Sequence, residues 1–294
     1  MKKNYSFLGR LALFGTAIIW GTSFVILKSA INSIGTLWVL AIRFILAALI
    51  MLAIAGKRLK KMDRHTLKGS ILMGLFLAVA YIVQTYGLVY TTPGKNAFLT
   101  ATYCVLVPFM AWGIYKRKPG KSNVIAALLC VTGIGFVSLS SGFGGMNIGD
   151  TLTLLSGVFY AMQIIMMEHY VDGGDSLSIS AVEFAAAAVL CLAGALVFEP
   201  APHNIPTDAW FTLAYLSIMC TAVCFFLQAW GMKYTPSSTA AVIMTLEAVF
   251  GVIFSLILGQ EQLTGRLCLG FVLIFISVLL NEAGDELVKR LKKS

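Results

Sequence analysis

Long uncharged runs recur along the whole chain, and they restrict its fold more than any other feature. Many of them approach the ~20 residues that a helix needs to cross ~30 Å of hydrocarbon. Every backbone N–H and C=O group in hydrocarbon needs a partner, which a helix supplies within its own segment. The alternating pattern of ~10-residue segments that is typical of a membrane barrel is absent from the sequence. The chain is therefore predicted to be an all-α, multi-pass membrane protein.

Composition agrees with this prediction. Of the 294 residues, 59% are apolar and 12% are charged, against about 45–50% and about 25% in a soluble domain. The first apolar run follows Lys2, Lys3 and Arg10 but has no small-residue cleavage site, so we read it as a retained helix. Ten transmembrane helices are expected, over residues 8–28, 35–55, 68–90, 94–115, 122–140, 149–168, 178–198, 208–230, 238–258 and 265–283.

The net charge of +9 follows from topology and does not indicate nucleic-acid binding. Eighteen of the 22 Lys and Arg residues fall on one side of the ten expected spans; the other four are Lys28, Lys95, Arg266 and, inside a span, Arg43. The positive-inside rule then places both termini in the cytoplasm. We expect a multi-pass protein of the plasma membrane (the bacterial inner membrane), with the lipid bilayer as a partner and no nucleic acid.

A phrase in the first half of the chain is nearly repeated in the second. QTYGLVYTTP at 84–93 returns as QAWGMKYTP at 228–236. Several residue pairs, all separated by nearly half the chain, match in order: Arg43 with Glu183, Gln84 with Gln228, Gly87 with Gly231, Pro93 with Pro236 and Lys118 with Glu261. This argues for duplication of a five-span unit. We therefore divide the chain into a repeat at 1–144 and a repeat at 145–294, the second ending in a basic cytoplasmic tail.

An odd number of spans per copy has a geometric consequence. The second copy starts on the opposite side of the membrane from the first, which is the inverted-topology repeat used by many secondary transporters. Two such copies exchange conformations to open a central cavity to one side and then to the other. The sequence thus predicts alternating access without naming a substrate.

The repeated phrase also has a local interpretation. Thr92-Pro93 and Thr235-Pro236 suit the N-cap and first position of a helix, because proline there loses no hydrogen bond. Gln84 and Gln228 lie about two turns before the ends of long apolar helices, where an amide facing lipid would be costly. Both glutamines should face the bundle interior, either to bond between helices or to line a polar cavity.

The chain resembles the EamA-type transporters of the drug/metabolite transporter superfamily over essentially its whole length. The resemblance is carried by IIWGTSFVILK at 18–28, LAIRFILAALI at 40–50, the two Q-x-x-G-x-x-Y phrases, LEAVFGVIFSLILGQE at 246–261 and Gly270. It implies a ten-helix carrier of small metabolites, commonly amino acids and often exported; related members handle sugars, nucleotide-linked sugars or quaternary amines. Two departures are Lys118, where members often carry an acidic residue, and Ala248 after Glu247, where proline is frequent.

Three charged residues that lie well inside expected spans are candidates for coupling or gating. Glu247 lies near the middle of its span, where a charged acid costs roughly 2.5–3.5 kcal/mol on insertion scales, so it should pair, bind a proton or face water. Proton coupling, recognition of a substrate ammonium group and a structural hydrogen bond are its three interpretations. Arg43 and Glu183 occupy matching repeat positions; we expect them in opposite leaflets, each snorkelling or acting as a local strut, with gating as the alternative.

Aromatic and polar side chains near the middle of several spans are candidates for lining the central cavity. The expected substrate-binding residues are Trp20, Thr22, Tyr81, Gln84, Tyr103, Tyr160, Gln163, Phe225 and Gln228. Packing between helices is the alternative for each ring. Trp20 is the preferred candidate, because the backbone could open at Gly21. Pro108 should kink its helix or free a carbonyl. Lys28 is expected at a solvated helix end.

Other classes of function find less support. The six cysteines sit in apolar runs without metal-ligand spacing, and the sequence has no HExxH motif and no GxxxxGK[ST] loop, so no metal, cofactor or enzyme activity is expected. A channel is disfavoured by the inverted repeat. The predicted function is secondary transport of a small molecule, first an amino acid or related amphipathic amine, with a sugar or nucleoside-type metabolite as the alternative. Protons are a candidate coupling ion, and a monomer or homodimer fits.

Overall fold

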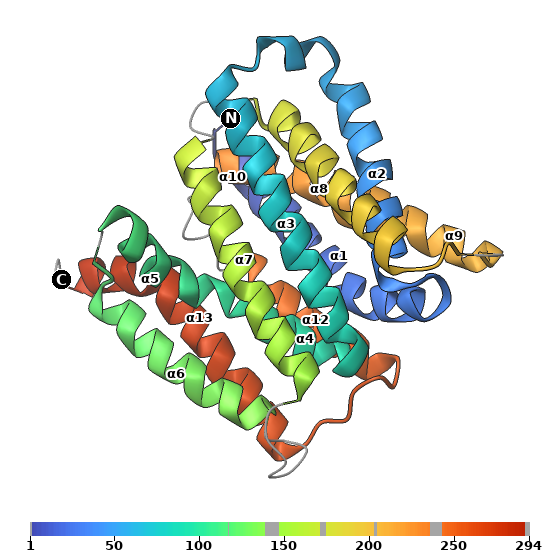
Figure 1. Ribbon diagram of the computed structural model, residues 1–294. Helices are drawn as coiled ribbons and strands as arrows, with labels where there is room; N and C mark the ends of the chain where they lie inside the picture. The colour runs from blue at the N-terminus through green and yellow to red at the C-terminus, as the bar shows by residue number, and fades with distance from the viewer. Residues whose placement is uncertain are drawn as a thin grey trace.

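The computed structural model describes residues 2–116, 118–138, 147–170, 175–202, 205–235 and 243–291. All the regular secondary structure in these ranges is helical (Figure 1). The elements are α1 (Lys2–Ile34), α2 (Thr36–Ala55), a 3-10 turn η1 (Gly56–Lys61), α3 (Arg64–Tyr90), α4 (Pro93–Ala101), α5 (Tyr103–Tyr115), α6 (Lys121–Ser138), α7 (Ile148–Tyr170), α8 (Ser176–Phe198), α9 (Thr207–Ala214), a π-helical segment η3 (Tyr215–Val223), α10 (Cys224–Tyr234), α12 (Leu246–Ile257) and α13 (Gly265–Leu291).

Every expected span overlaps one of these helical segments. Seven segments are long and apolar enough to cross a membrane, and shorter apolar helices cover Lys121–Val137, Leu246–Ile257 and Gly265–Asn281. The chain is thus a multi-pass, all-helical membrane protein over the residues that the structure describes. The start of the expected span 238–258, including the Thr235-Pro236 cap, and the end of 122–140 lie partly outside the described residues. α1 is longer than expected, since it begins at Lys2 and ends at Ile34.

The sequence signals for helix starts hold where the structure describes them. Thr92 precedes Pro93 at the first position of α4, and its hydroxyl accepts from the N–H of Lys95 at 3.4 Å. Asp63 begins α3: Oδ1 accepts from the N–H groups of Thr66 (2.9 Å) and His65 (2.8 Å). These bonds, with the Thr66 N–H first, lower the pKa of Asp63.

Two helices contain a break that the sequence did not locate. α4 ends and α5 begins around Thr102, and α12 begins after Thr245; both threonines have φ −62° and ψ −16°. Pro108, where a kink or a freed carbonyl is expected, lies inside α5, six residues after Thr102. Proline does free the carbonyl of Cys104 four residues before it, and the Asn281 Nδ2 of α13 donates to that oxygen at 2.8 Å.

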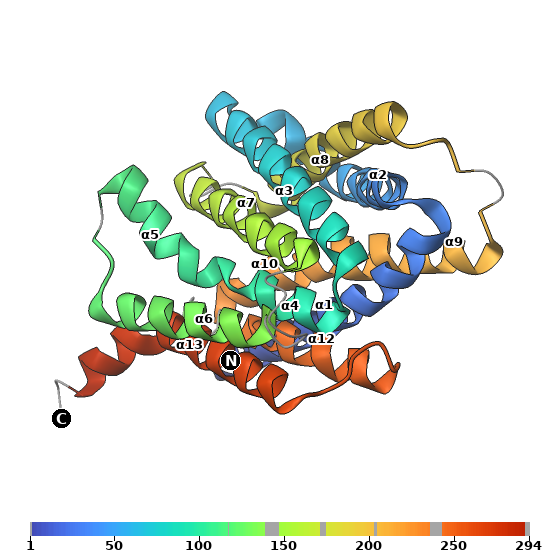
Figure 2. The same ribbon diagram turned by 60° about the horizontal axis from the view of Figure 1, so that its bottom comes forward.

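The first and second halves of the chain (residues 1–144 and 145–294) interleave. α2 packs on α8, α3 on α7, α6 on α13, and α1 on both α10 and α12 (Figures 1 and 2). Glycines bring two of these pairs into backbone contact. A Cβ on Gly87 of α3 would lie 2.9 Å from the carbonyl of Gly149 on α7, and a Cβ on Gly231 of α10 would lie 2.9 Å from the carbonyl of Gly9 on α1.

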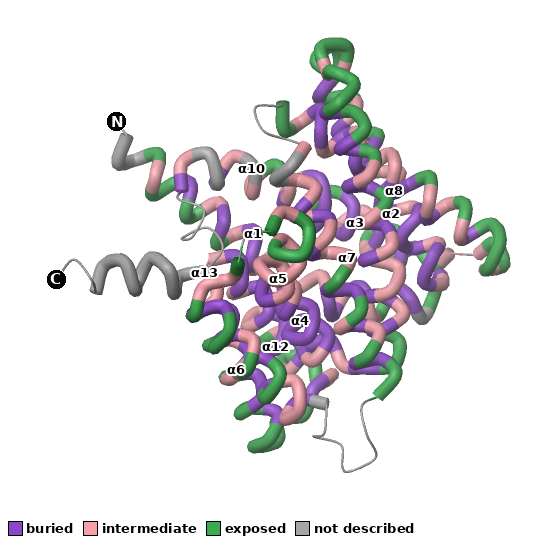
Figure 3. The backbone as a smooth tube through the Cα atoms, turned by 60° about the vertical axis from the view of Figure 1, so that its left-hand side comes forward, coloured by how far each residue is buried: buried purple, intermediate pink, exposed green. Residues whose placement is uncertain are grey.

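Buried stretches surround the middle of the bundle, and α4 lies almost wholly within them (Figure 3). One apolar cluster joins α2, α3 and α8 around Phe44 and Phe184, and another joins α4, α5, α6, α12 and α13 around Phe98 and Phe271. Small residues make this packing possible, as expected for helices in lipid: a Cβ on Gly74 would lie 2.3 Å from the carbonyl of Glu183. The site described next lies beside the first cluster.

Candidate functional site

Six aromatic rings from six helical segments form a continuous row between the two halves; we name it the aromatic chain. Its centroid distances are Trp20–Phe225 5.4 Å, Phe225–Phe184 5.0 Å, Phe184–Phe44 6.3 Å, Phe44–Tyr81 5.2 Å and Tyr81–Tyr160 5.6 Å. Tyr103 extends the row at 6.0 Å from Tyr160. Five of the expected site residues are therefore brought together: Trp20, Tyr81, Tyr103, Tyr160 and Phe225.

Arg43 lies against the middle of this chain. Its Nε donates to the Thr221 hydroxyl at 2.8 Å, its Nη2 to the Tyr81 hydroxyl at 3.4 Å, and its guanidinium stands 4.8 Å from the centre of the Tyr81 ring. The side chain is 1% exposed, so of the two expected roles, snorkelling and a local strut, these contacts support the strut. Thr221 belongs to η3, whose wider turn is an uncommon geometry often found at functional sites. Arg43 thus ties α2 to α3 and to the π-helical segment.

Glu183 lies near Arg43 in depth but has its own partner. Phe44 and Phe184, the residues that follow these two charges, pack together, because α2 and α8 cross at this level. Arg43 and Glu183 therefore lie at neighbouring levels of the bundle, and their placement in opposite leaflets stays a prediction. Glu183 is 1% exposed and accepts from the Gln163 amide at 2.7 Å, and no described ion pair joins it to Arg43.

Gln84 joins three helices. Its Nε2 donates to the Thr100 hydroxyl of α4 at 2.8 Å, and its Oε1 accepts from the Tyr160 hydroxyl of α7 at 2.8 Å. Of the two interpretations of this glutamine, bonding between helices is the one that these contacts support. Its counterpart Gln228 is half-buried, and no hydrogen bond links it to another residue in the described ranges.

Glu247 stands at the start of α12, two residues after the break at Thr245. It is 8% exposed, and within the described part of the chain no hydrogen bond or ion pair reaches it. A buried acid without a fixed partner is able to exchange a proton or meet a cation.

The remaining expected residues have local roles. Thr22 donates or accepts a 2.8 Å bond with the Tyr215 hydroxyl, and the Trp20 indole donates to the carbonyl of Cys220 at 2.7 Å. α1 is continuous at Gly21, where the backbone could open. A Cβ on Gly21 would lie 2.4 Å from the Cβ of Phe250, so this glycine admits the close approach of α12.

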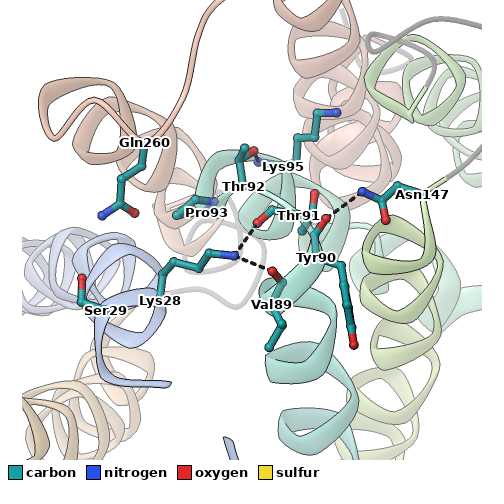
Figure 4. Close-up of a pocket in the computed structure, with 10 residues that line it drawn as sticks. All are labelled: Lys28, Ser29, Val89, Tyr90, Thr91, Thr92, Pro93, Lys95, Asn147 and Gln260. Carbon is teal, nitrogen blue, oxygen red and sulfur yellow. Dashed lines mark hydrogen bonds between the residues drawn. The ribbon is translucent and has the colours of Figure 1, made fainter. Parts of the chain in front are cut away.

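A cavity of about 530 Å³ opens at the end of the bundle where α3 ends and α4 begins (Figure 4). Lys28 lies in its wall, and its ammonium donates to the carbonyls of Leu88, of Val89 (2.8 Å) and of Thr91 (3.1 Å). A freely solvated helix end was expected for Lys28. The ammonium group is instead bound, because the last carbonyls of α3 have no partner within the helix and can accept its hydrogen bonds. None of the nine expected substrate-binding residues lines this cavity.

An acid from the second half approaches the same place. Glu261, 7% exposed in the segment between α12 and α13, interacts with the Thr92 hydroxyl and with the N–H groups of Lys95 and Gly94. A Cβ on Gly94 would lie 2.5 Å from its Oε2. Burial raises the pKa of Glu261, and these N–H and hydroxyl contacts oppose that shift. The carboxyl group thus sits on the first turn of α4.

Several polar residues in this arrangement were missed. Glu199 accepts from the N–H groups of Leu37 (3.0 Å) and Trp38 (3.3 Å) at the start of α2, and Thr91 donates to Asp150 at 2.7 Å. A buried acid in an apolar run is a usable signal for Asp150, whereas nothing distinguishes Thr221 or Thr100 from other threonines. No three His, Cys, Asp or Glu side chains in the described ranges could hold a metal ion.

Comparison with known proteins identifies the family. The profile of the EamA-like transporter family matches the chain twice, over residues 7–139 and 147–282. An uncharacterized transporter of Archaeoglobus fulgidus is 35% identical over 95% of this chain and 86% of its own length. The uncharacterized transporter YoaV of Bacillus subtilis is 23% identical over 92% and 95%. A solved structure described only as the crystal structure of a protein covers 96% of this chain and 98% of its own, with a TM-score of 0.70 at 17% identity, so it supports the fold alone. The chain belongs to the EamA-like transporter family and is a membrane transporter.

Proposed function

We propose that this transporter is a secondary carrier that works by alternating access between two inverted five-helix halves. Its cargo is a small amphipathic metabolite, first an amino acid or a related amine, carried outward across the bacterial inner membrane. Both termini face the cytoplasm, as the distribution of Lys and Arg favours. Amino-acid cargo and the outward direction follow from the resemblance of the sequence.

The duplication is supported by the double match of one family profile and by matched contacts. Gly87 meets Gly149 between α3 and α7, and Gly231 meets Gly9 between α10 and α1. In sequence the first contact maps onto the second, because Gly87 and Gly231 differ by 144 and Gly9 and Gly149 by 140. Thr102 and Thr245, which share one backbone conformation, differ by 143.

The inversion is supported by where these contacts occur. The Gly87–Gly149 contact lies at the end of the bundle that holds Lys28, which bonds the last carbonyls of α3. Gly9 precedes Lys28 by 19 residues on the same helix, a rise of about 28 Å. Equivalent contacts thus occur at opposite ends of the bundle, as a pseudo-two-fold axis in the membrane plane that relates the two halves requires.

The aromatic chain is the observation that carries the proposal. Read from either end, it repeats its own geometry: Trp20–Phe225 matches Tyr160–Tyr81, and Phe225–Phe184 matches Tyr81–Phe44. Trp20, Tyr81, Tyr160 and Phe225 are only half-buried, although each packs on its neighbours in the row. Their remaining surface supports a path between the two halves along which a small molecule meets rings on both sides.

The chemistry of this region favours an amphipathic cargo. Ring faces bind apolar groups and attract cations. Glu247, buried and without a described partner, supplies a carboxylate for an ammonium group or a proton. Hydroxyl and amide groups are concentrated on the Tyr81–Tyr160 side, at Gln84 and Thr100. A sugar would find few free donors and acceptors on the Trp20–Phe225 side.

The proposal is tested by counterflow into proteoliposomes that contain the purified protein. Vesicles loaded with unlabelled leucine, phenylalanine, threonine, phenethylamine or glucose are diluted into the labelled compound. A carrier accumulates label transiently and saturably, and internal substrate accelerates entry. Linear, non-saturating entry would instead indicate a pore, and counterflow with glucose alone would reject the amphipathic cargo.

The role of Glu247 is tested in the same vesicles with an imposed pH gradient. We expect Glu247→Gln to abolish any stimulation by the gradient while counterflow continues, because exchange needs no net proton movement. The matched control is Asp208→Asn, which neutralises an exposed acid on α9. An unchanged response in Glu247→Gln would assign proton coupling elsewhere and leave the carrier mechanism intact.

A further inference from the structure

The carbonyl groups at the C-terminal end of α3 converge on a single ammonium group. A helix leaves its last carbonyls without partners inside the helix, and they carry partial negative charge. Lys28 of α1 donates to the carbonyls of Leu88, of Val89 (2.8 Å) and of Thr91 (3.1 Å). A primary ammonium ion has three N–H donors, and each of them finds an acceptor here. The end of α3 is therefore built to hold an ammonium group.

A molecule inside the adjoining cavity has access to the same acceptors. Val89 and Thr91 line the cavity, and Figure 4 shows their carbonyl oxygens meeting the Lys28 ammonium at its wall. Gln260 lines the cavity from the segment between α12 and α13. Its Oε1 is buried, and among the described residues nothing donates a hydrogen bond to it. Because a buried acceptor of this kind calls for a donor, Gln260 supplies the third acceptor for a ligand.

The size and the charge of the surroundings suit a small cation. The volume of about 530 Å³ falls within the roughly 300–1,000 Å³ of ordinary ligand pockets. Two buried acids flank the connection between α3 and α4: Asp150, which accepts from the Thr91 hydroxyl at 2.7 Å, and Glu261 on the first turn of α4. Lys95 also lines the cavity, and its side chain is directed away from Lys28 (Figure 4). A cation that takes the place of the Lys28 ammonium thus meets favourable charge.

We propose that this cavity binds the primary ammonium group of the cargo, and that Lys28 occupies the site as a tethered substitute when no cargo is bound. The inference rests on the proposed function for the class of cargo, an amino acid or a related amine. Exchange of one ammonium group for another keeps the α3 carbonyls bonded, and leaving them unpaired would be costly. Under the proposed topology the cavity opens to the exterior, where an exporter releases its cargo.

The displaced lysine gives this site a preference among cargoes. The charge of Lys28 stays beside the cavity when a second ammonium group enters, and the two charges repel each other. A carboxylate on the cargo offsets this repulsion, so phenylalanine should bind the wild type better than phenethylamine, which lacks the carboxylate. Lys28→Met removes both the repulsion and the tethered competitor, and a ligand gains apparent affinity when its site is no longer blocked. The preference should therefore reverse in this variant.

Deuterium uptake by the amides of residues 88–95 reports on this site separately from the aromatic chain. The purified protein is titrated with phenylalanine, phenethylamine and trimethyl(2-phenylethyl)ammonium, which keeps the ring and the charge but has no N–H donor. Without ligand, uptake should be faster in Lys28→Met than in the wild type. Phenethylamine should then protect Lys28→Met at a concentration roughly tenfold below that of phenylalanine, and the wild type should show the opposite order. The trimethyl compound should protect neither protein.

Two further variants complete the test. Lys60→Met removes an exposed cation of η1 and should keep the wild-type order of ligands. Gln260→Met leaves the Lys28 contacts in place and should raise the protecting concentration of phenylalanine roughly threefold, which tests the site even if Lys28→Met fails to fold.

The inference would be overturned by an unchanged concentration in Gln260→Met, by equal protection from the primary and trimethyl compounds in Lys28→Met, or by no protection of residues 88–95 at all. Counterflow in the wild type without such protection would reject the site and keep the carrier. Protection in the predicted order without counterflow would reject the proposed function and keep the site.

Discussion

The two ends of the aromatic chain have the same spacing and different chemistry. On one side Tyr81 and Tyr160 stand 5.6 Å apart, with hydroxyls bonded toward Arg43 and Gln84. On the other, Phe225 and Trp20 stand 5.4 Å apart without a hydroxyl. The ring spacing is thus nearly the same on the two sides, while the polarity differs. A ring spacing that both sides share fits a conformational change in which both sides take part. Hydroxyl groups that only the Tyr81–Tyr160 side carries fit a role in selecting among cargoes.

Helix contacts shared by the two halves should be the most damaging to disturb. Gly87→Val and Gly231→Val each put a branched side chain where a Cβ already comes within 2.9 Å of a facing backbone carbonyl. We expect both to lower the free energy of unfolding by about 1–3 kcal/mol or more and to reduce counterflow alike. Thermal unfolding in detergent measures the first effect. The variant Gly113→Val, at a glycine with open space around it, is the control.

The two glutamines should differ, because only one is bonded to neighbouring helices. Gln84→Met leaves the Thr100 and Tyr160 hydroxyls without their partner and should cost about 1–3 kcal/mol of unfolding free energy. Gln228→Met should cost less than about 0.5 kcal/mol. Equal losses in the two variants would contradict the asymmetry and point to a partner for Gln228 among the residues not described.

The two outermost rings should behave alike in stability. Trp20→Phe removes the donor to the Cys220 carbonyl, and Tyr160→Phe removes the donor to Gln84. Each substitution is expected to lower the free energy of unfolding by about 0.5–1.5 kcal/mol, the range for single hydrogen bonds between membrane helices. Their effects on cargo choice should diverge, and competition for counterflow between phenylalanine and threonine measures this. If the competition profiles stay identical, polarity on the Tyr160 side has no part in selection.

The smallest effects are expected from exchanging polarity at the matched inner rings. Tyr81→Phe loses only a long bond of 3.4 Å from Arg43, and Phe225→Tyr adds a hydroxyl at the matching place. Neither substitution should change the free energy of unfolding by more than about 0.5 kcal/mol. The double variant reverses the polarity of the pair, so it should change the ranking of cargoes while total flux persists. An unchanged ranking would limit selection to Tyr160 and Gln84.

The sequence predicted the helices well because hydrocarbon thickness and apolar runs determine them almost alone. It also predicted that Gln84 faces inward, since an amide in lipid is costly. It did not reveal how helices cross: α2 and α8 meet at Phe44 and Phe184, which brings Arg43 and Glu183 to neighbouring levels of the bundle. It failed also at Thr102, because a break fixed by tertiary packing has no residue signature comparable to Pro108.

The interleaving of the halves has a consequence for biosynthesis. The helices of the first half find their principal neighbours in the second, since α2 packs on α8, α3 on α7 and α6 on α13. A nascent chain that has inserted only its first six helical elements therefore holds polar groups such as Arg43 and Asn96 without the partners Thr221 and Thr153. Assembly within the bilayer completes only after the ribosome has released α13, so truncation near the C-terminus would leave a membrane-inserted but unassembled polypeptide.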